Sequence, residues 1–119
     1  MANIYHAGID LGTSRSTITT STGKRLTTLT CVGHCKDLIA RKRFGKDWLL
    51  GEEALGHRLA LEMVWPLADG VIRDDEKSLE ATRLVLQDLI TQTLPKKQAD
   101  DKLYAAIGVP AQASLNSKK

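Results

Sequence analysis

The stretch Ala7-Gly-Ile-Asp-Leu-Gly-Thr-Ser-Arg-Ser-Thr17 decides the fold. It reads as a strand that ends near Asp10, a turn at Gly12, and a second strand of small and β-branched residues. A turn signal at residues 21–24 and an alternating pattern over residues 25–32 add a third strand. The opening block is therefore predicted to be a three-stranded antiparallel meander.

Two further segments have a clear hydrophobic pattern. A helix is predicted from Asp75 to Leu94, because apolar residues return at three- and four-residue spacing between an acidic start and Pro95. The apolar run from Leu103 to Val109 is typical of a strand inside a parallel or mixed sheet that is covered on both faces. Meander, helix and apolar strand together predict an α/β fold with a mixed sheet.

The middle of the chain has a less regular pattern. Residues 38–43 and 48–50 are interpreted as short strands around a turn at 45–47, and a short helix is expected from Glu52, with Leu55 and Leu59 on one face. We therefore expect two parts. Residues 1–32 and 71–119 form a core subdomain that includes the first hairpin, and residues 33–70 form a small inserted outer lobe.

Composition excludes some classes of function. The 119 residues are 42% apolar and 26% charged, which is the usual balance of a globular domain. The net charge of +3 is dispersed and aromatic residues make up only 4%, so nucleic-acid binding is not expected. Neither a membrane-spanning apolar stretch nor a signal-peptide pattern is visible, so the sequence predicts a cytoplasmic chain without membrane insertion.

Cysteine and histidine residues do not form a convincing site. Cys31 and Cys35, with His34 beside them, lack the second ligand pair that a structural zinc site needs. The two thiols are interpreted as reduced cysteines. Neither His6 nor His57 belongs to a nucleophile, base and acid arrangement, so no catalytic residue is assigned.

The turn that follows Asp10 carries the chemistry. Its backbone N–H groups, from Gly12 through Thr13 and Ser14 to Arg15, can form a concave anion site for terminal phosphates. Asp10 is placed to hold a water of a Mg²⁺ ion, and Thr13, Ser14 and Ser16 add hydroxyl donors. Arg15 either brings positive charge to the site or points away. An ordinary small-residue hairpin remains the alternative, because acid-glycine turns are common.

Four ordered stretches resemble one family. Gly8-Ile-Asp-Leu-Gly-Thr13 is similar to the first phosphate loop of the actin, DnaK-type chaperone and sugar kinase superfamily. Gly51-Glu-Glu-Ala54, Trp65-Pro-Leu-Ala-Asp-Gly-Val-Ile72 and Ile107-Gly-Val-Pro-Ala111 are similar, in order and spacing, to bacterial actins. Within that family the magnetosome-associated proteins come nearest, and the MreB group follows. The resemblance runs from Ile4 to the last residue and covers an amino-terminal portion of the family's sequence.

The resemblance implies a partial actin-like (ribonuclease H-like) ATPase subdomain whose full-length relatives close over ATP and Mg²⁺ and add head to tail into filaments. Asp10 would be the metal carboxylate, and Gly12, Thr13, Ser14 and Arg15 would hold phosphate. Residues 38–61 would lie in the lobe that contacts the next subunit. Like subunits, and possible magnetosome-associated proteins, are the expected partners.

The family's hydrolytic residue, second phosphate loop and adenine pocket lie beyond Pro110, so the nucleotide site of this chain is expected to be incomplete and its catalysis poor. Two alternatives stay open. In the first, the chain is a short interaction module that docks on or regulates a full-length filament. In the second, it is a truncated chaperone or sugar kinase of the same superfamily. The apolar strand from Leu103, without a second covering helix, is also expected to favour self-association.

Overall fold

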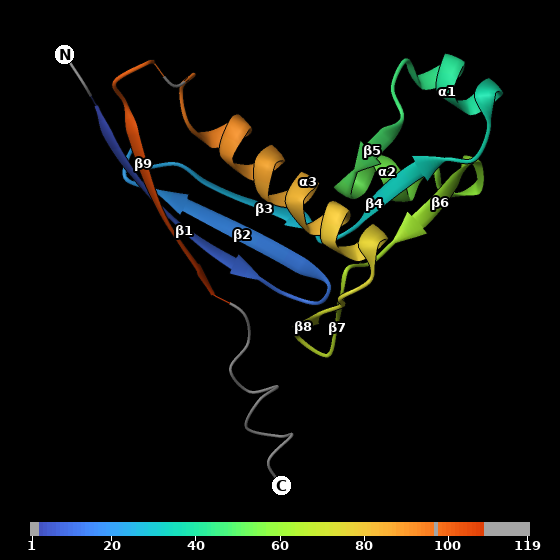
Figure 1. Cartoon of the computed structure of the whole chain (residues 1–119), viewed down its shortest axis with the longest axis horizontal. Coiled ribbons are helices and arrows are strands. Elements are labelled where there is room, and N and C mark those ends of the chain that lie inside the picture. Colours follow the sequence, from blue (N-terminus) through green and yellow to red (C-terminus); the bar gives the residue numbers. More distant parts are fainter. Residues whose placement is uncertain (1–2, 97, 109–119) are drawn as a thin grey trace, which may run out of the picture.

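The computed structural model of the chain describes residues 3–96 and 98–108. Figure 1 shows two sheets side by side, with one long helix packed along them. The elements, in order, are β1 (Ile4–Leu11), β2 (Arg15–Thr20), β3 (Arg25–Leu29), β4 (Val32–Cys35), α1 (Leu38–Phe44), β5 (Trp48–Leu50), α2 (Gly51–Gly56), the 3₁₀ turn η1 (Arg58–Ala60), β6 (Leu61–Val64), β7 (Leu67–Ala68), β8 (Val71–Ile72), α3 (Glu76–Thr93) and β9 (Lys102–Gly108).

The main sheet confirms the predicted topology. Its four strands lie in the order β3-β2-β1-β9, with antiparallel pairs in the meander and a parallel pair between β1 and β9. The register sets Asp10 opposite Gly108 across the parallel pair. Because paired residues point to the same face of a sheet, Asp10 and Gly108 share the face opposite to that of Ile9 and Leu11.

The helix α3 covers the face that carries Ile9 and Leu11, which are 3% and 1% exposed. Asp75 caps the helix, because its carboxylate accepts the Ser78 amide at 3.0 Å. The buried apolar residues packed with α3 form one cluster, the main cluster. Its members are Ala7, Ile9, Leu11, Ile18, Val32, Leu67, Ala81, Val85 and Leu89. The predicted helix is confirmed, although Leu79, one of the apolar residues at helical spacing, is 51% exposed.

The second sheet, in the order β5-β4-β6, has an apolar cluster of its own. Its buried members are Cys35, Ala40, Leu49, Ala54 and Leu61. The strand predicted at 48–50 is present as β5, and the short helix starts one residue before Glu52. That helix ends at Gly56, however, so Leu59 falls in the 3₁₀ turn and is 88% exposed instead of sharing a face with Leu55.

The strand predicted at residues 38–43 is wrong, because this segment is the helix α1. Asp37 accepts the Ala40 amide at 2.9 Å and starts the helix, and Gly45 ends it in a left-handed conformation with a bond to the Arg41 carbonyl. Ala40 and Phe44, four residues apart, pack into the apolar cluster of the second sheet. The local caps therefore outweigh the strand-like pattern of the sequence.

Two predicted strand boundaries also differ. The third strand leaves the main sheet after Leu29, because the Cys31 carbonyl accepts the Gly51 amide at 2.8 Å and the chain then enters the second sheet as β4. The apolar strand runs from Lys102 to Gly108, and Val109 lies outside the described residues. In place of the predicted cover on both faces, the residues of β9 are mostly exposed, and among the described residues β9 pairs with β1 alone.

Candidate functional site

The turn between β1 and β2 is closed tightly around Gly12. A Cβ atom added to Gly12 would lie 2.4 Å from the Arg15 carbonyl oxygen, closer than real side chains come to backbone. The absence of a side chain at Gly12 is therefore required by the turn itself. Thr13, Ser14 and Arg15 are all exposed, so the turn offers its polar groups to solvent.

Asp10 lies beside this turn on the uncovered face of the main sheet. Asp10 is exposed, and within residues 3–96 and 98–108 no ion pair or side-chain hydrogen bond engages its carboxylate. The neighbouring strand presents Gly108, where even a Cβ would lie 3.7 Å from an oxygen of the Asp10 carboxylate. The carboxylate is thus open on the side of β9, and it can accept a hydrogen bond from a water molecule bound to a metal ion.

The side chain of Thr13 ties the turn to a distant hairpin. Its hydroxyl oxygen accepts a 2.6 Å hydrogen bond from the amide of Gly70. Asp69 and Gly70 have positive φ angles of 52° and 78°, which fits the type I′ turn that a two-residue β-hairpin favours. The hydroxyl hydrogen of Thr13 is not used in this bond, so Thr13 can still donate to an anion.

Buried hydroxyls support the turn from below. Thr30 donates its amide to the Ser14 carbonyl at 2.8 Å, and its hydroxyl lies 2.6 Å from that of Ser16. Ser16 and Thr30 are both fully buried. Ser16, expected as a hydroxyl donor of the site, is therefore a supporting residue that points into the protein.

The turn therefore combines an open carboxylate, an exposed guanidinium and two exposed hydroxyls on a bend held by buried bonds. Among the described residues Arg15 makes no ion pair, so its charge is not neutralised by a neighbouring acid. Sequence reasoning identified these groups but missed the contacts of Gly70 and Thr30. The Asp-Gly pair at 69–70 was the visible signal for the hairpin.

Two hollows in the surface of the described residues lie away from the turn. One of about 450 Å³ lies between the end of α3 and β9, lined by residues that include Ile90, Leu94 and Leu103. Another, of about 410 Å³, lies on the uncovered face of the sheet between Thr19 and Ala106. The residues of the turn line neither hollow.

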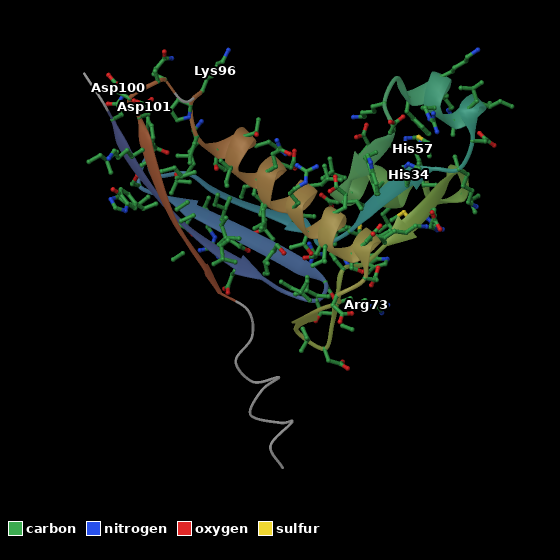
Figure 2. All side chains as sticks on the ribbon, viewed as in Figure 1. His34, His57, Arg73, Lys96, Asp100 and Asp101 are labelled. Carbon is green, nitrogen blue, oxygen red and sulfur yellow. The ribbon has the colours of Figure 1, made fainter. Side chains whose placement is uncertain are left out.

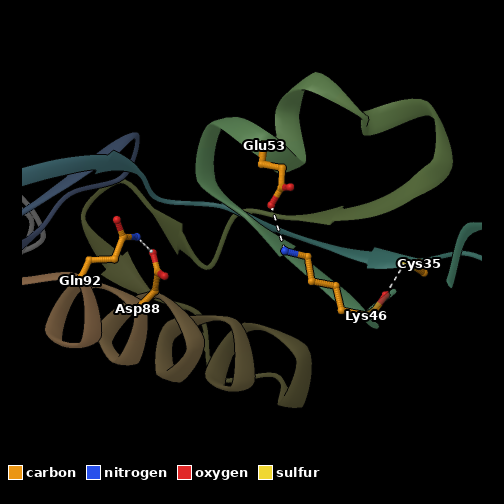
Figure 3. Close-up of polar contacts among 5 residues, drawn as sticks. All are labelled: Cys35, Lys46, Glu53, Asp88 and Gln92. Atoms are coloured by element: carbon orange, nitrogen blue, oxygen red, sulfur yellow. Dashed lines mark hydrogen bonds and ion pairs between the residues drawn. The ribbon is translucent and has the colours of Figure 1, made fainter. Parts of the chain in front are cut away.

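The other candidate residues have structural roles. The thiol of Cys31 contacts the Gly51 carbonyl, and burial raises the pKa of this thiol to about 11. The thiol of Cys35 contacts the Lys46 carbonyl at 3.3 Å, next to the Lys46–Glu53 ion pair (Figure 3). In the part of the chain that the structure describes, His, Cys, Asp and Glu residues nowhere gather in threes to hold a metal ion.

The histidines pack against aromatic rings. His34 lies 4.6 Å from the ring of Trp48 and His57 lies 4.8 Å from that of Phe44, measured between centroids. Figure 2 shows both histidines on the second sheet and its helices, away from the β1–β2 turn. Trp48 is half-buried and packs against the main cluster, whereas Trp65 is 37% exposed.

Comparison with known proteins gives a consistent result. No family model matches the chain. It is 39% identical over 117 residues to the actin-like protein MamK of Magnetospirillum gryphiswaldense, covering 98% of this chain and 32% of that protein. MamK of Paramagnetospirillum magneticum is 37% identical, with 98% and 33% covered. The chain thus spans about a third of the length of these relatives.

Solved structures agree with the sequences. A MamK double helical filament superposes with a TM-score of 0.83 at 34% identity, covering 98% of this chain and 35% of that one. A non-polymerising MamK mutant bound to AMPPNP gives a TM-score of 0.78 at 31% identity, with 91% and 33% covered. Helices long and apolar enough to span a membrane are absent from the described residues.

The resemblance predicted from the four motifs is confirmed at the level of family and fold. Sequence and structure together group this chain with the bacterial actin-like proteins of the MamK kind, over the third of such a protein that it spans.

Proposed function

We propose that the chain is the nucleotide-binding lobe of an actin-like, ATP-dependent filament protein, in which the β1–β2 turn holds nucleotide phosphates. The observation that carries the proposal is the exposed Asp10 beside a tight glycine turn in which Thr13, Ser14 and Arg15 are exposed. The similarity to a MamK protein bound to AMPPNP supports a nucleotide as the ligand.

The donor set fits the proposed ligands. Mg²⁺ prefers oxygen ligands and retains much of its water, which suits a single exposed carboxylate such as Asp10. The turn from Gly12 to Arg15 supplies amides, two hydroxyls and a guanidinium, all of which suit phosphate oxygens. When bound, Mg²⁺ would neutralise phosphate charge and orient the phosphates.

Assembly with like subunits belongs to the same proposal, because a MamK double helical filament shares this fold. We place the subunit contact in the outer lobe, residues 33–70, and the phosphate site in the core subdomain, residues 1–32 and 71–119. The separate apolar cluster beneath β4, β5 and β6 supports this division. A cytoplasmic, cytoskeletal location and magnetosome-associated partners follow from the same family.

Titration with Mg-AMPPNP, followed by two-dimensional amide NMR of the full chain, tests the phosphate site. Weak binding is expected, with the largest shifts at the amides of Gly12 to Arg15. Asp10→Asn should weaken the Mg²⁺ dependence of these shifts. Asp88→Asn is the matched control, because Asp88 bonds to Gln92 on α3 (Figure 3) and should leave binding unchanged.

The proposal would be overturned by shifts confined to other segments, or by an Asp10 variant that binds Mg-AMPPNP as the natural chain does. Tight binding with steady hydrolysis of ATP would contradict the expected incompleteness of the site. In that case the phosphate site would stand. The hydrolytic residue, second phosphate loop and adenine pocket expected beyond Pro110 would then not be needed for hydrolysis.

A further inference from the structure

The helix α2 begins at a glycine that lies in close contact with the main sheet. Gly51 is buried, and its φ angle of 59° lies in the left-handed region that favours glycine. A Cβ atom added here would lie 2.5 Å from the hydroxyl oxygen of Thr28, a residue of β3. A larger residue in place of Gly51 would therefore force Thr28 or the start of α2 to move.

Gly51 is also bonded to the segment that leads from the main sheet to the second sheet. Its amide donates to the Cys31 carbonyl at 2.8 Å, and the Cys31 thiol donates to the Gly51 carbonyl at 3.5 Å. Cys31 is fully buried, so water does not compete for these bonds. Figure 1 shows α2 near the place where β3 leads into β4, and α2 contacts both strands. We refer to Thr28, Cys31 and Gly51 as the α2 junction.

The residue next to Cys31 is bonded to the β1–β2 turn. The Thr30 amide donates to the Ser14 carbonyl at 2.8 Å, and the hydroxyl oxygens of Thr30 and Ser16 lie 2.6 Å apart. Thr30 and Ser16 are fully buried, as Cys31 is. A single peptide unit, between Thr30 and Cys31, therefore separates the α2 junction from the residue that holds the turn.

We propose that Gly51 is a positioning residue of the β1–β2 turn and acts through Cys31 and Thr30. Protein interiors are close-packed and transmit small displacements instead of absorbing them. The two bonds from α2 fix the Cys31 peptide, and with it the direction of the Thr30 amide. That amide holds the carbonyl of Ser14, so the arrangement of the N–H groups in the turn depends on where α2 lies.

Other contacts between the two sheets do not reach the turn in this way. The Lys77–Glu62 ion pair joins α3 to β6, but both side chains are more than half exposed, so the pair is weak. The amide of Gly70 does reach Thr13, but Leu67 of that hairpin packs in the main cluster and not in the cluster of the second sheet. We therefore assign the link between the second sheet and the turn to the α2 junction.

The consequence is a coupling between the outer lobe and phosphate binding, and this part rests on the proposed function. A contact that displaces α2 would rearrange the turn and change its affinity for phosphate. By linkage, a ligand bound at the turn must bias the position of α2 by the same free energy. The geometry of the α2 junction itself requires no nucleotide, so the positioning role and the phosphate site are tested separately.

Two-dimensional amide NMR of the full chain without nucleotide tests the positioning role. Gly51→Ala should shift the amides of the turn, residues 12–15, together with that of Thr30. Gly45→Ala is the matched control, because Gly45 has a similar φ angle of 73° but a Cβ atom there meets nothing within 4 Å. This control should leave the turn unchanged, and urea unfolding shows whether both variants are folded.

A second substitution separates positioning from a general loss of stability. Thr28→Ala removes the hydroxyl that the new methyl group meets. Gly51→Ala combined with Thr28→Ala should therefore return the turn amides to their positions in Thr28→Ala alone. A helix that is only destabilised would gain nothing from the loss of a hydroxyl in β3.

Titration with Mg-AMPPNP measures the coupling. Gly51→Ala should bind at least about fivefold more weakly than the natural chain. Gly45→Ala should bind as the natural chain does, and the double variant should recover the affinity of Thr28→Ala. In the natural chain the nucleotide should also shift the Gly51 amide, because linkage acts in both directions.

Cysteine variants repeat the test with a milder change. Cys31→Ala removes the thiol bond to Gly51 and keeps the backbone bonds, so it should shift the turn amides in the same direction as Gly51→Ala, but less. Cys35→Ala is its control, because Cys35 is also buried but its thiol bonds to the Lys46 carbonyl, away from the turn. This pair of variants decides the question if Gly51→Ala does not fold.

The proposal is overturned if the turn amides of folded Gly51→Ala coincide with those of the natural chain, or if Gly45→Ala shifts them equally. Cys31→Ala that moves the turn no more than Cys35→Ala also overturns it. If the natural chain does not respond to Mg-AMPPNP while Gly51→Ala still moves the turn, the nucleotide falls and the positioning role stands. If both chains bind Mg-AMPPNP equally well, the coupling falls and the phosphate site stands.

Discussion

The hydroxyl of Thr13 accepts a 2.6 Å hydrogen bond from the amide of Gly70, a residue 57 positions further along the chain. This bond connects the turn after β1 to the hairpin of β7 and β8. Gly70 is buried, so its amide depends on this acceptor. The turn and the hairpin are therefore expected to share one conformation.

Thr13→Val should lower the free energy of unfolding by about 1–2 kcal/mol, because the shape of the side chain is kept while the Gly70 amide loses its acceptor. Thr13→Ser keeps the hydroxyl and is the control. Urea unfolding followed by circular dichroism measures the difference. Equal stability of the Val and Ser variants would show that water replaces the hydroxyl at no cost.

The Gly12 turn predicts a large effect for a small change. Gly12→Ala should destabilise the chain by about 1–3 kcal/mol, because the new methyl group collides with the Arg15 carbonyl. Gly8→Ala in the preceding strand β1 meets nothing within 4 Å and should be neutral or slightly stabilising. Paired urea titrations of the two variants compare them, and equal midpoints would contradict the close packing of the turn.

The buried pair of Ser16 and Thr30 predicts non-additive mutations. Ser16→Ala leaves the Thr30 hydroxyl buried without its partner and should cost about 1–3 kcal/mol. Thr30→Val should have a similar cost. The double variant removes both hydroxyls, so its cost should be well below the sum of the single costs. A double-mutant cycle in urea measures this coupling, and simple additivity would refute it.

The cap of α3 predicts a dependence on pH. Hydrogen bonds from the Ser78 hydroxyl and amide lower the pKa of Asp75 below its ordinary value of 3.8. A lowered folded pKa stabilises the fold fully above the ordinary value, and this stabilisation is lost as pH falls through the folded value. Acidification should therefore reduce the thermal unfolding temperature in part through Asp75.

Two variants separate the charge of Asp75 from its capping role. Asp75→Asn still offers an oxygen to the Ser78 amide but does not titrate, so its unfolding temperature should fall less steeply in acid. Asp75→Ala should be less stable at every pH. Differential scanning calorimetry over a pH series distinguishes them, and identical pH profiles for Asp and Asn would exclude Asp75 as a contributor.

Local patterns predicted the elements whose signals are periodic. The alternation of the first three strands and the capped, amphipathic run of α3 are visible in the sequence alone, and the structure confirms both. The helix α1 was missed because its signal lies in the flanking caps, Asp37 and Gly45, rather than in its own short run. Its seven residues give little room for a helical period.

Contacts between distant segments were beyond sequence reasoning. The polar groups of the turn could be predicted from Asp10, Gly12 and Thr13, but local pattern carries no information on which residue meets Thr13 across 57 positions. Leu79 shows the same limit, because it has helical spacing but lies on the exposed side of α3. Tertiary packing selects which of several apolar stripes is buried.

The cluster of Cys35, Ala40, Leu49, Ala54 and Leu61 has no member in common with the cluster beneath α3. Each cluster is therefore a separate dry interior, and the two meet where Val32, Trp48, Leu50 and Val64 of the second sheet pack with the cluster beneath α3. Amide hydrogen exchange should accordingly fall into two tiers, in which β4, β5 and β6 lose protection as one cooperative unit and β1 with β2 as another.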